Sequence, residues 1–110
     1  MDERPALLLV HGSWHGPWCW DRLLPELAAR GLRAGTVALP SCAADPGPRG
    51  GLADDARAVA QAAAAIAGPV IVVGHSYGGV AISAADHPAQ VTRLIYLGAF
   101  MPDSGRALVS

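Results

Sequence analysis

The stretch GHSYGG, residues 74–79, decides the fold of this 110-residue chain. It fits the pattern G-x-S-x-G, the nucleophile elbow, in which a serine occupies a sharp turn between a strand and a helix. Glycine at Gly74 and Gly78 suits this turn, because the turn brings backbone segments close together and forces a strained conformation on the serine. Ser76 is therefore the candidate nucleophile.

The sequence around the motif predicts the strand and the helix that the turn requires. Val70–Val73 is a run of β-branched residues, which is typical of a buried strand. Small residues from Tyr77 to Asp86 then predict a helix, which Pro88 ends. A serine between glycines is usually an ordinary turn, and this strand-turn-helix context is what favours the functional interpretation.

The rest of the chain repeats this alternation of strands and helices. Ala6–Val10 is an unbroken apolar run, typical of a strand buried on both faces. Gly31 is expected to end the first helix, whose apolar stripe includes Trp20. The predicted elements are strands at Ala6–Val10, Arg33–Leu39, Val70–Val73 and Val91–Leu97, and helices at Trp18–Arg30, Leu52–Ala67 and Tyr77–Asp86. Proline and glycine make residues 40–51 a loop.

This order predicts an α/β fold of one domain, residues 1–110. Right-handed crossovers give a mainly parallel four-stranded sheet with helices on both faces, in three layers. Ligands of such sheets bind at the carboxyl ends of the strands. If the first strand lies beside the third, His11, Gly12 and Ser13 meet residues 74–79 at that edge. Asp54 and Asp55 fall in the first turn of the second helix, where carboxylates favour the helix dipole.

Composition excludes several classes of function. A net charge of −1 gives no electrostatic case for nucleic acid or an anionic membrane. The chain has no lysine, which excludes a P-loop. No stretch approaches the roughly 20 apolar residues of a membrane span, and the start of the chain lacks the features of a secretory signal. We therefore expect a cytoplasmic protein.

Neither metal nor cofactor binding is expected. Cys19 and Cys42 lack CxxC spacing, and we interpret them as small buried apolar residues. His11 and His15 have the i, i+4 spacing of a zinc pair, but Gly12 stands where H-E-x-x-H needs its glutamate.

Three segments together resemble the α/β-hydrolase superfamily, in its branch of small esterases and hydroxynitrile lyases. They are Leu9–Trp20, the GHSYGG motif and Leu97–Asp103, in the order that the branch uses. The resemblance implies a partial α/β-hydrolase fold, and a hydrolase of the serine esterase type acting on a small ester or related carbonyl substrate. It implies no cofactor. A hydroxynitrile lyase of this branch uses a lysine, so hydrolysis is the expected activity.

The resemblance also implies the role of each matching residue. Ser76 corresponds to the nucleophile, and the backbone N–H groups of Ser13 and Tyr77 correspond to the oxyanion-hole donors. A serine hydroxyl needs a histidine to accept its proton and an acid to orient that histidine. In the family both follow the nucleophile on later strands, so the chain resembles the amino-terminal half, without the cap and the carboxyl-terminal strands.

No local residue is a good substitute for this histidine. His87 follows Ser76 by eleven residues along a helix, roughly 16 Å away. His75 should point away from Ser76, and the family uses His11 and His15 to pack the oxyanion loop. Asp103 falls near where some related families place the catalytic acid, but a turn aspartate after Pro102 is the simpler interpretation.

Two other functions remain open. The chain would be a non-catalytic small-ligand-binding module if Trp14, Trp18, Trp20 and Tyr77 lined a pocket, although the tryptophans have the spacing of helix core residues. A nucleotide-binding Rossmann unit is disfavoured, because the motif lacks G-x-G-x-x-G spacing. Separately, Val91–Leu97 would form an uncovered apolar edge, from which we expect self-association.

Overall fold

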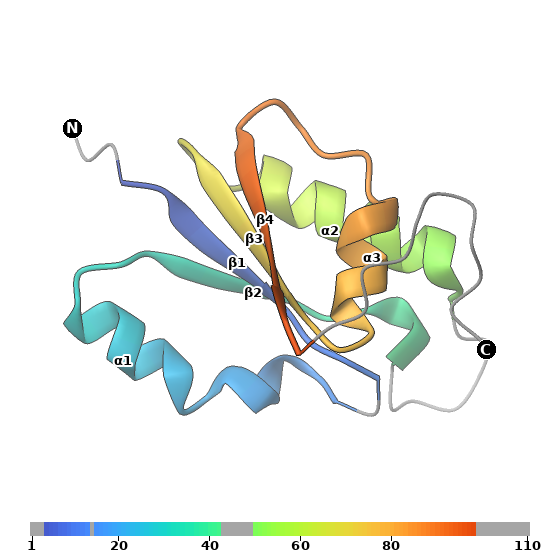
Figure 1. Cartoon of the computed structure of the whole chain (residues 1–110), viewed down its shortest axis with the longest axis horizontal. Helices are drawn as coiled ribbons and strands as arrows, with labels where there is room; N and C mark the ends of the chain where they lie inside the picture. The colour runs from blue at the N-terminus through green and yellow to red at the C-terminus, as the bar shows by residue number, and fades with distance from the viewer. Residues whose placement is uncertain (1–3, 14, 43–49, 99–110) are drawn as a thin grey trace.

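Four parallel strands form a single sheet in the order β2-β1-β3-β4 (Figure 1). The computed structural model describes residues 4–13, 15–42 and 50–98. The strands are β1 (Ala6–Val10), β2 (Ala34–Val37), β3 (Val70–His75) and β4 (Val91–Leu97). The helices are α1 (Leu23–Ala29), α2 (Leu52–Ala64) and α3 (Gly78–Ala84), with short 3-10 helices η1 (Pro17–Trp20) and η2 (Pro40–Cys42).

The predicted fold class is confirmed, and the first strand does lie beside the third, which is the condition for the loop after it to meet residues 74–79. Val10 of β1 lies opposite Gly74 of β3, so the two strands end at the same edge of the sheet. The segments that follow them therefore start side by side. This arrangement places the loop after β1 next to the GHSYGG turn.

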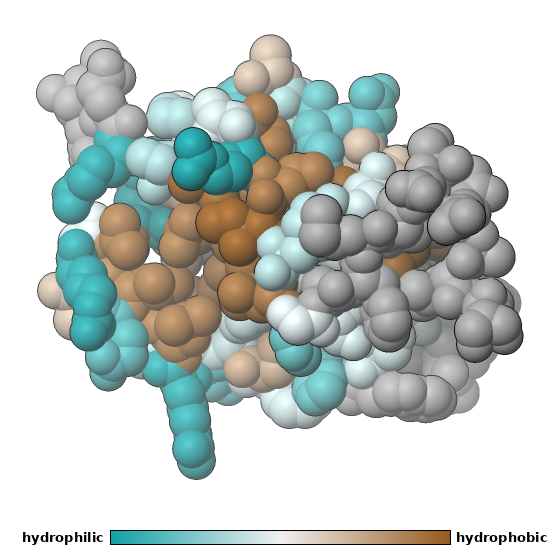
Figure 2. Space-filling view, in the orientation of Figure 1, coloured by the Kyte–Doolittle hydropathy of each residue, from teal (hydrophilic) through white to brown (hydrophobic). Residues whose placement is uncertain are grey.

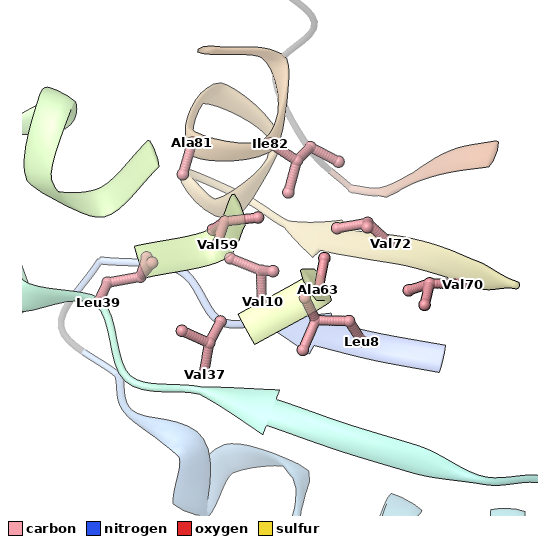
Figure 3. Close-up of a cluster of buried hydrophobic side chains, with 10 residues drawn as sticks. All are labelled: Leu8, Val10, Val37, Leu39, Val59, Ala63, Val70, Val72, Ala81 and Ile82. Carbon is pink, nitrogen blue, oxygen red and sulfur yellow. The ribbon is translucent and has the colours of Figure 1, made fainter. Parts of the chain in front are cut away.

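The larger hydrophobic core lies between the sheet and the pair α2 and α3. Figure 1 shows these two helices on one side of the sheet, with α1 apart from them. The core residues come from three strands, two helices and the segment after β2, and all are buried (Figure 3): Leu8, Val10, Val37, Leu39, Val59, Ala63, Val70, Val72, Ala81 and Ile82. Buried apolar area is the main force that holds these layers together.

A smaller cluster covers the opposite face. Leu9, Trp20 and Val73 are its buried members, and Leu24 and Leu27 of α1 pack against them. Side chains of successive strand residues point to opposite faces, so Leu8 and Leu9 serve different layers. The three-layer prediction is therefore correct.

The first helical segment differs from its prediction as one helix over Trp18–Arg30. It is divided into η1 and α1, and Pro25 is the third residue of α1. A proline lacks the N–H group and clashes with the carbonyl four residues earlier, so an α-helix accepts it only in the first turn. The division leaves Trp18 61% exposed, whereas Trp20 is buried as predicted. The prediction of Trp18 as a core residue was wrong.

The outer strand β4 is less covered than its neighbours. It pairs with β3 and with no other described strand. Ile95 and Leu97 are 36% and 44% exposed, while Leu94 and Tyr96 pack against the larger core. Apolar side chains gather in the middle of the face drawn in Figure 2, over the sheet. The predicted exposure of this strand is therefore confirmed for Ile95 and Leu97, but not for Val91 and Leu94, which are partly buried against the larger core.

Candidate active site

Ser76 lies between the end of β3 at His75 and the start of α3 at Gly78. Its φ angle is +56°, and it is the one non-glycine residue in the described ranges with a positive φ. This left-handed conformation is unfavourable for a residue with a side chain and persists only where the surrounding structure enforces it. Ser76 is therefore held in a strained turn.

The glycines on either side of Ser76 allow backbone to pack directly on backbone. A Cβ atom on Gly74 would lie 2.7 Å from the carbonyl oxygen of Gly78. A Cβ atom on Gly78 would lie 2.5 Å from the carbonyl oxygen of Val10. Real Cβ atoms do not approach this closely, so the turn and its contact with β1 both require glycine.

The loop after β1 lies against Ser76. A Cβ atom on Gly12 would be 3.0 Å from Ser76 Cβ and 3.5 Å from Ser76 Oγ. Ser13 follows directly, and its backbone N–H makes no hydrogen bond to another described residue. The same holds for the backbone N–H of Tyr77 within the described part of the chain. The backbone N–H groups of Ser13 and Tyr77, which have no partner among the described residues, thus belong to segments that flank the serine.

His11 holds this loop in place. Its side chain is buried, Nδ1–H donates to the carbonyl oxygen of Gly12 over 2.8 Å, and Nε2 accepts from the N–H of Leu39 over 3.1 Å. These partners assign the neutral tautomer. Burial also lowers the pKa of His11, opposed by the Gly12 hydrogen bond and the charge of Asp55. Both nitrogens are occupied, so His11 is not a base for Ser76.

None of the other three histidines makes a hydrogen bond to Ser76, and two of them bond to backbone carbonyl oxygens instead. His15 Nδ1 bonds to the carbonyl oxygen of Ser13 over 3.0 Å. His75 is exposed, and its ring centroid lies 6.4 Å from that of His15 and 6.5 Å from that of Trp20. His87 Nε2 bonds to the carbonyl oxygen of Ile82 over 2.7 Å. No residue in the described ranges makes a hydrogen bond to Ser76 Oγ.

A buried polar cluster beside the turn is absent from the sequence predictions. Asp55 is completely buried, and its carboxylate accepts hydrogen bonds from Ser41 and from the Tyr77 hydroxyl. Asp55 lies in the first turn of α2 as predicted, but its burial among hydrogen-bond partners was not predicted from the sequence. The helical spacing indicates this burial, because Asp55 lies three residues after Leu52 and four before Val59, and therefore on the apolar face of the helix.

The neighbouring Asp54 does follow the prediction for a helix start. It is partly exposed, accepts from the N–H of Gly51 over 2.9 Å, and pairs with Arg57 over 3.1 Å. The Gly51 hydrogen bond, followed by Arg57, lowers the pKa of Asp54. Two adjacent aspartates therefore have different roles.

The remaining predictions concern metal, membrane and ligand sites. Within the described ranges, no three histidine, cysteine or acidic side chains are grouped as a metal site would require. None of the described helices combines the length and the apolar character needed to cross a membrane. Cys19 and Cys42 are both free. Trp14 and Asp103 lie outside the described residues.

Comparisons with known proteins agree on one family. The model of the alpha/beta hydrolase family matches residues 7–109. Esterase PIR7B of Oryza sativa subsp. japonica is 35% identical over 112 aligned residues, which cover 94% of this chain and 42% of that protein. The alpha-hydroxynitrile lyase of Arabidopsis thaliana is 33% identical, over 94% of this chain and 43% of that protein.

Solved structures give the same result. A pyrethroid hydrolase from Sphingobium faniae JZ-2 superposes with a TM-score of 0.73 at 36% identity, over 86% of this chain and 40% of that one. An extracellular alpha/beta-hydrolase from a Paenibacillus species reaches a TM-score of 0.80 at 25% identity, over 90% of this chain and 42% of that one. The chain spans about two fifths of the length of these relatives. It belongs to the alpha/beta hydrolase family.

Proposed function

We propose that this chain provides the nucleophile and the oxyanion hole of a serine esterase acting on a small ester or related carbonyl compound. The observation that carries the proposal is Ser76 itself, strained at φ +56° and packed against Gly12. The relatives support the class of reaction, since they include an esterase from rice and a pyrethroid hydrolase.

In the proposed reaction, Ser76 Oγ forms a bond to the carbonyl carbon of the ester. The carbonyl oxygen then carries a negative charge, which the backbone N–H groups of Ser13 and Tyr77 stabilise. Neither donor makes a hydrogen bond to another described residue, which supports their assignment to the oxyanion. Collapse of the intermediate expels the alcohol and leaves an acyl group on Ser76, which water hydrolyses.

The proton of Ser76 Oγ must pass to a base. None of the four histidines makes a hydrogen bond to this oxygen. We therefore assign the base, and the acid that orients it, to polypeptide outside these 110 residues. The chain itself would then bind and position the carbonyl group, and react with activated reagents more slowly than a whole enzyme.

Covalent labelling tests the proposal. The chain is treated at alkaline pH with an activated alkyl phosphonofluoridate, and the modified residue is located by peptide mass spectrometry. We expect the adduct on Ser76, its loss in Ser76→Ala, and its retention in Ser83→Ala, which removes an exposed hydroxyl bonded to Tyr96. Binding of a small apolar ester without any Ser76 adduct would instead support a non-catalytic ligand-binding module.

A further inference from the structure

The carboxylate of Asp55 is fully buried and has three hydrogen-bond donors. Oδ1 accepts from the Ser41 N–H over 2.9 Å, and Oδ2 accepts from the Ser41 hydroxyl over 2.5 Å and the Tyr77 hydroxyl over 2.6 Å. Within the described residues it has no cationic partner. Burying a charge without such bonds is very unfavourable, so the hydrogen bonds are needed for this carboxylate to be where it is.

The donors come from two segments that border the proposed oxyanion hole. Tyr77 follows Ser76 directly, and its backbone N–H is one of the two proposed donors. Ser41 belongs to η2, the segment that follows β2. Asp55, from α2, therefore ties the turn to η2 through the Tyr77 side chain. Burial, and then the contact with Asp55, raises the pKa of the Tyr77 hydroxyl, so it stays protonated and keeps donating.

The segment around η2 also reaches the second proposed donor. The N–H of Leu39 donates to His11 Nε2, and His11 Nδ1–H donates to the carbonyl oxygen of Gly12. Ser13 is the next residue. Residues 39–41 thus connect to the Tyr77 segment through Asp55, and to the Ser13 segment through His11.

We propose that Asp55 is a positioning residue, which holds the Tyr77 backbone N–H in alignment with that of Ser13 by fixing the Tyr77 side chain against η2. This inference rests on the proposed function, because alignment of the two donors matters only if an oxyanion forms there. Asp55 itself does not touch the substrate. Its effect is on the rate of the covalent step rather than on binding.

The experiment uses the phosphonofluoridate labelling of Ser76, measured at several reagent concentrations. This separates the limiting labelling rate from the half-saturating concentration. Tyr77→Phe removes a single hydroxyl and leaves the backbone N–H and the Asp55–Ser41 bonds. We expect it to lower the limiting rate about tenfold and leave the half-saturating concentration unchanged, since losing a whole oxyanion donor costs about 100-fold or more.

Variants of the two aspartates provide the matched comparison. Asp55→Ala should lower the limiting rate further than Tyr77→Phe, and Asp55→Asn, which keeps an acceptor oxygen, should restore part of it. Asp54→Ala removes the adjacent carboxylate and a helix cap, and should leave the limiting rate unchanged. A folded Tyr77→Phe variant that reacts at the wild-type rate would overturn the proposal.

Amide hydrogen exchange distinguishes failure of this inference from failure of the proposed function. The N–H groups of Gly79 and Val80 donate to the carbonyl oxygens of Ser76 and Tyr77 within the turn. In Tyr77→Phe these two amides should exchange faster, while amides of β1 keep their protection. If wild-type chain gives no Ser76 adduct but the exchange changes as expected, the proposed function fails and Asp55 still holds the turn. If exchange at Gly79 and Val80 is unchanged, the positioning role fails.

Discussion

β3 has one neighbour on each side, and the two sides are packed differently. Toward β1, backbone touches backbone, because only the absence of a Cβ lets Gly78 lie against the Val10 carbonyl. Toward β4, the strands pair in parallel with one register shift at the start of β3, and Ile95 and Leu97 remain exposed. The tight side carries the proposed nucleophile and both of the proposed oxyanion donors. The comparison shows that the geometry around Ser76 depends on backbone contacts between the turn after β3 and the end of β1. On the open side, toward β4, apolar side chains are by contrast exposed.

The largest expected effect is at Gly78. Gly78→Ala should lower the free energy of unfolding by about 3 kcal/mol, because the new methyl group meets the backbone of β1, which cannot yield as a side chain would. Gly35→Ala is the control, since its Cβ would lie 3.8 Å from Ile66 Cδ1, an ordinary contact. Urea denaturation of both variants checks the prediction. If both variants lose the same free energy of unfolding, the contact between Gly78 and β1 is not tighter than an ordinary contact.

Next in size is the strain at Ser76. Ser76→Gly should be more stable than Ser76→Ala by about 1 kcal/mol, because glycine adopts a positive φ without the clash that a Cβ causes. Thermal and urea unfolding of the two variants measure the difference. An alanine variant as stable as the glycine variant would show that the turn carries no strain.

The tight side should also respond to pH through His11. Burial lowers its pKa in the folded protein below the ordinary value of 6.5, so the unfolded chain binds more protons between the two values. The stability that the folded protein gains from keeping His11 neutral is fully present above pH 6.5. It is lost as the pH falls from 6.5 toward the pKa of His11 in the folded protein. Asp55, which raises the pKa of the ring, and His15, which lowers it, are the titratable groups that also act on it.

His11→Gln tests this pH dependence. The amide of glutamine offers an NH2 group that can donate and an oxygen that can accept, but it does not titrate. We expect the free energy of unfolding of this variant to fall less than that of wild type on acidification below pH 6.5. If the free energy of unfolding of the two proteins falls equally with pH, His11 is not the source of the pH dependence.

The smallest effect on stability is expected on the open side. Ile95→Lys should change the free energy of unfolding by no more than about 0.5 kcal/mol, because the side chain is already 36% exposed. It should nevertheless reduce the self-association that we expect from an uncovered strand edge. Gln61→Lys adds the same charge on the exposed side of α2 and should leave association unchanged. Light scattering of wild type and the two variants measures their association. A monodisperse wild-type monomer would contradict the expected self-association.

Much of the architecture was predictable from local sequence. Apolar runs of β-branched residues and leucine predict the strands, and glycine and proline mark where the chain turns. Errors arose where a single residue was judged by its neighbours in sequence. Pro25 divided a helix whose apolar spacing was otherwise continuous, and Trp18 became exposed as a result.

The sequence by itself determined the order of strands and helices, the GHSYGG turn and the family, because periodicity and motif spacing are properties of short stretches. Only the tertiary structure decided which groups bond to the buried Asp55, that His11 is a neutral link between Gly12 and Leu39, and how closely Gly12 packs against Ser76. These contacts join residues from separate strands and helices. The partners of a buried polar side chain depend on which segments pack around it, and local sequence does not identify those segments.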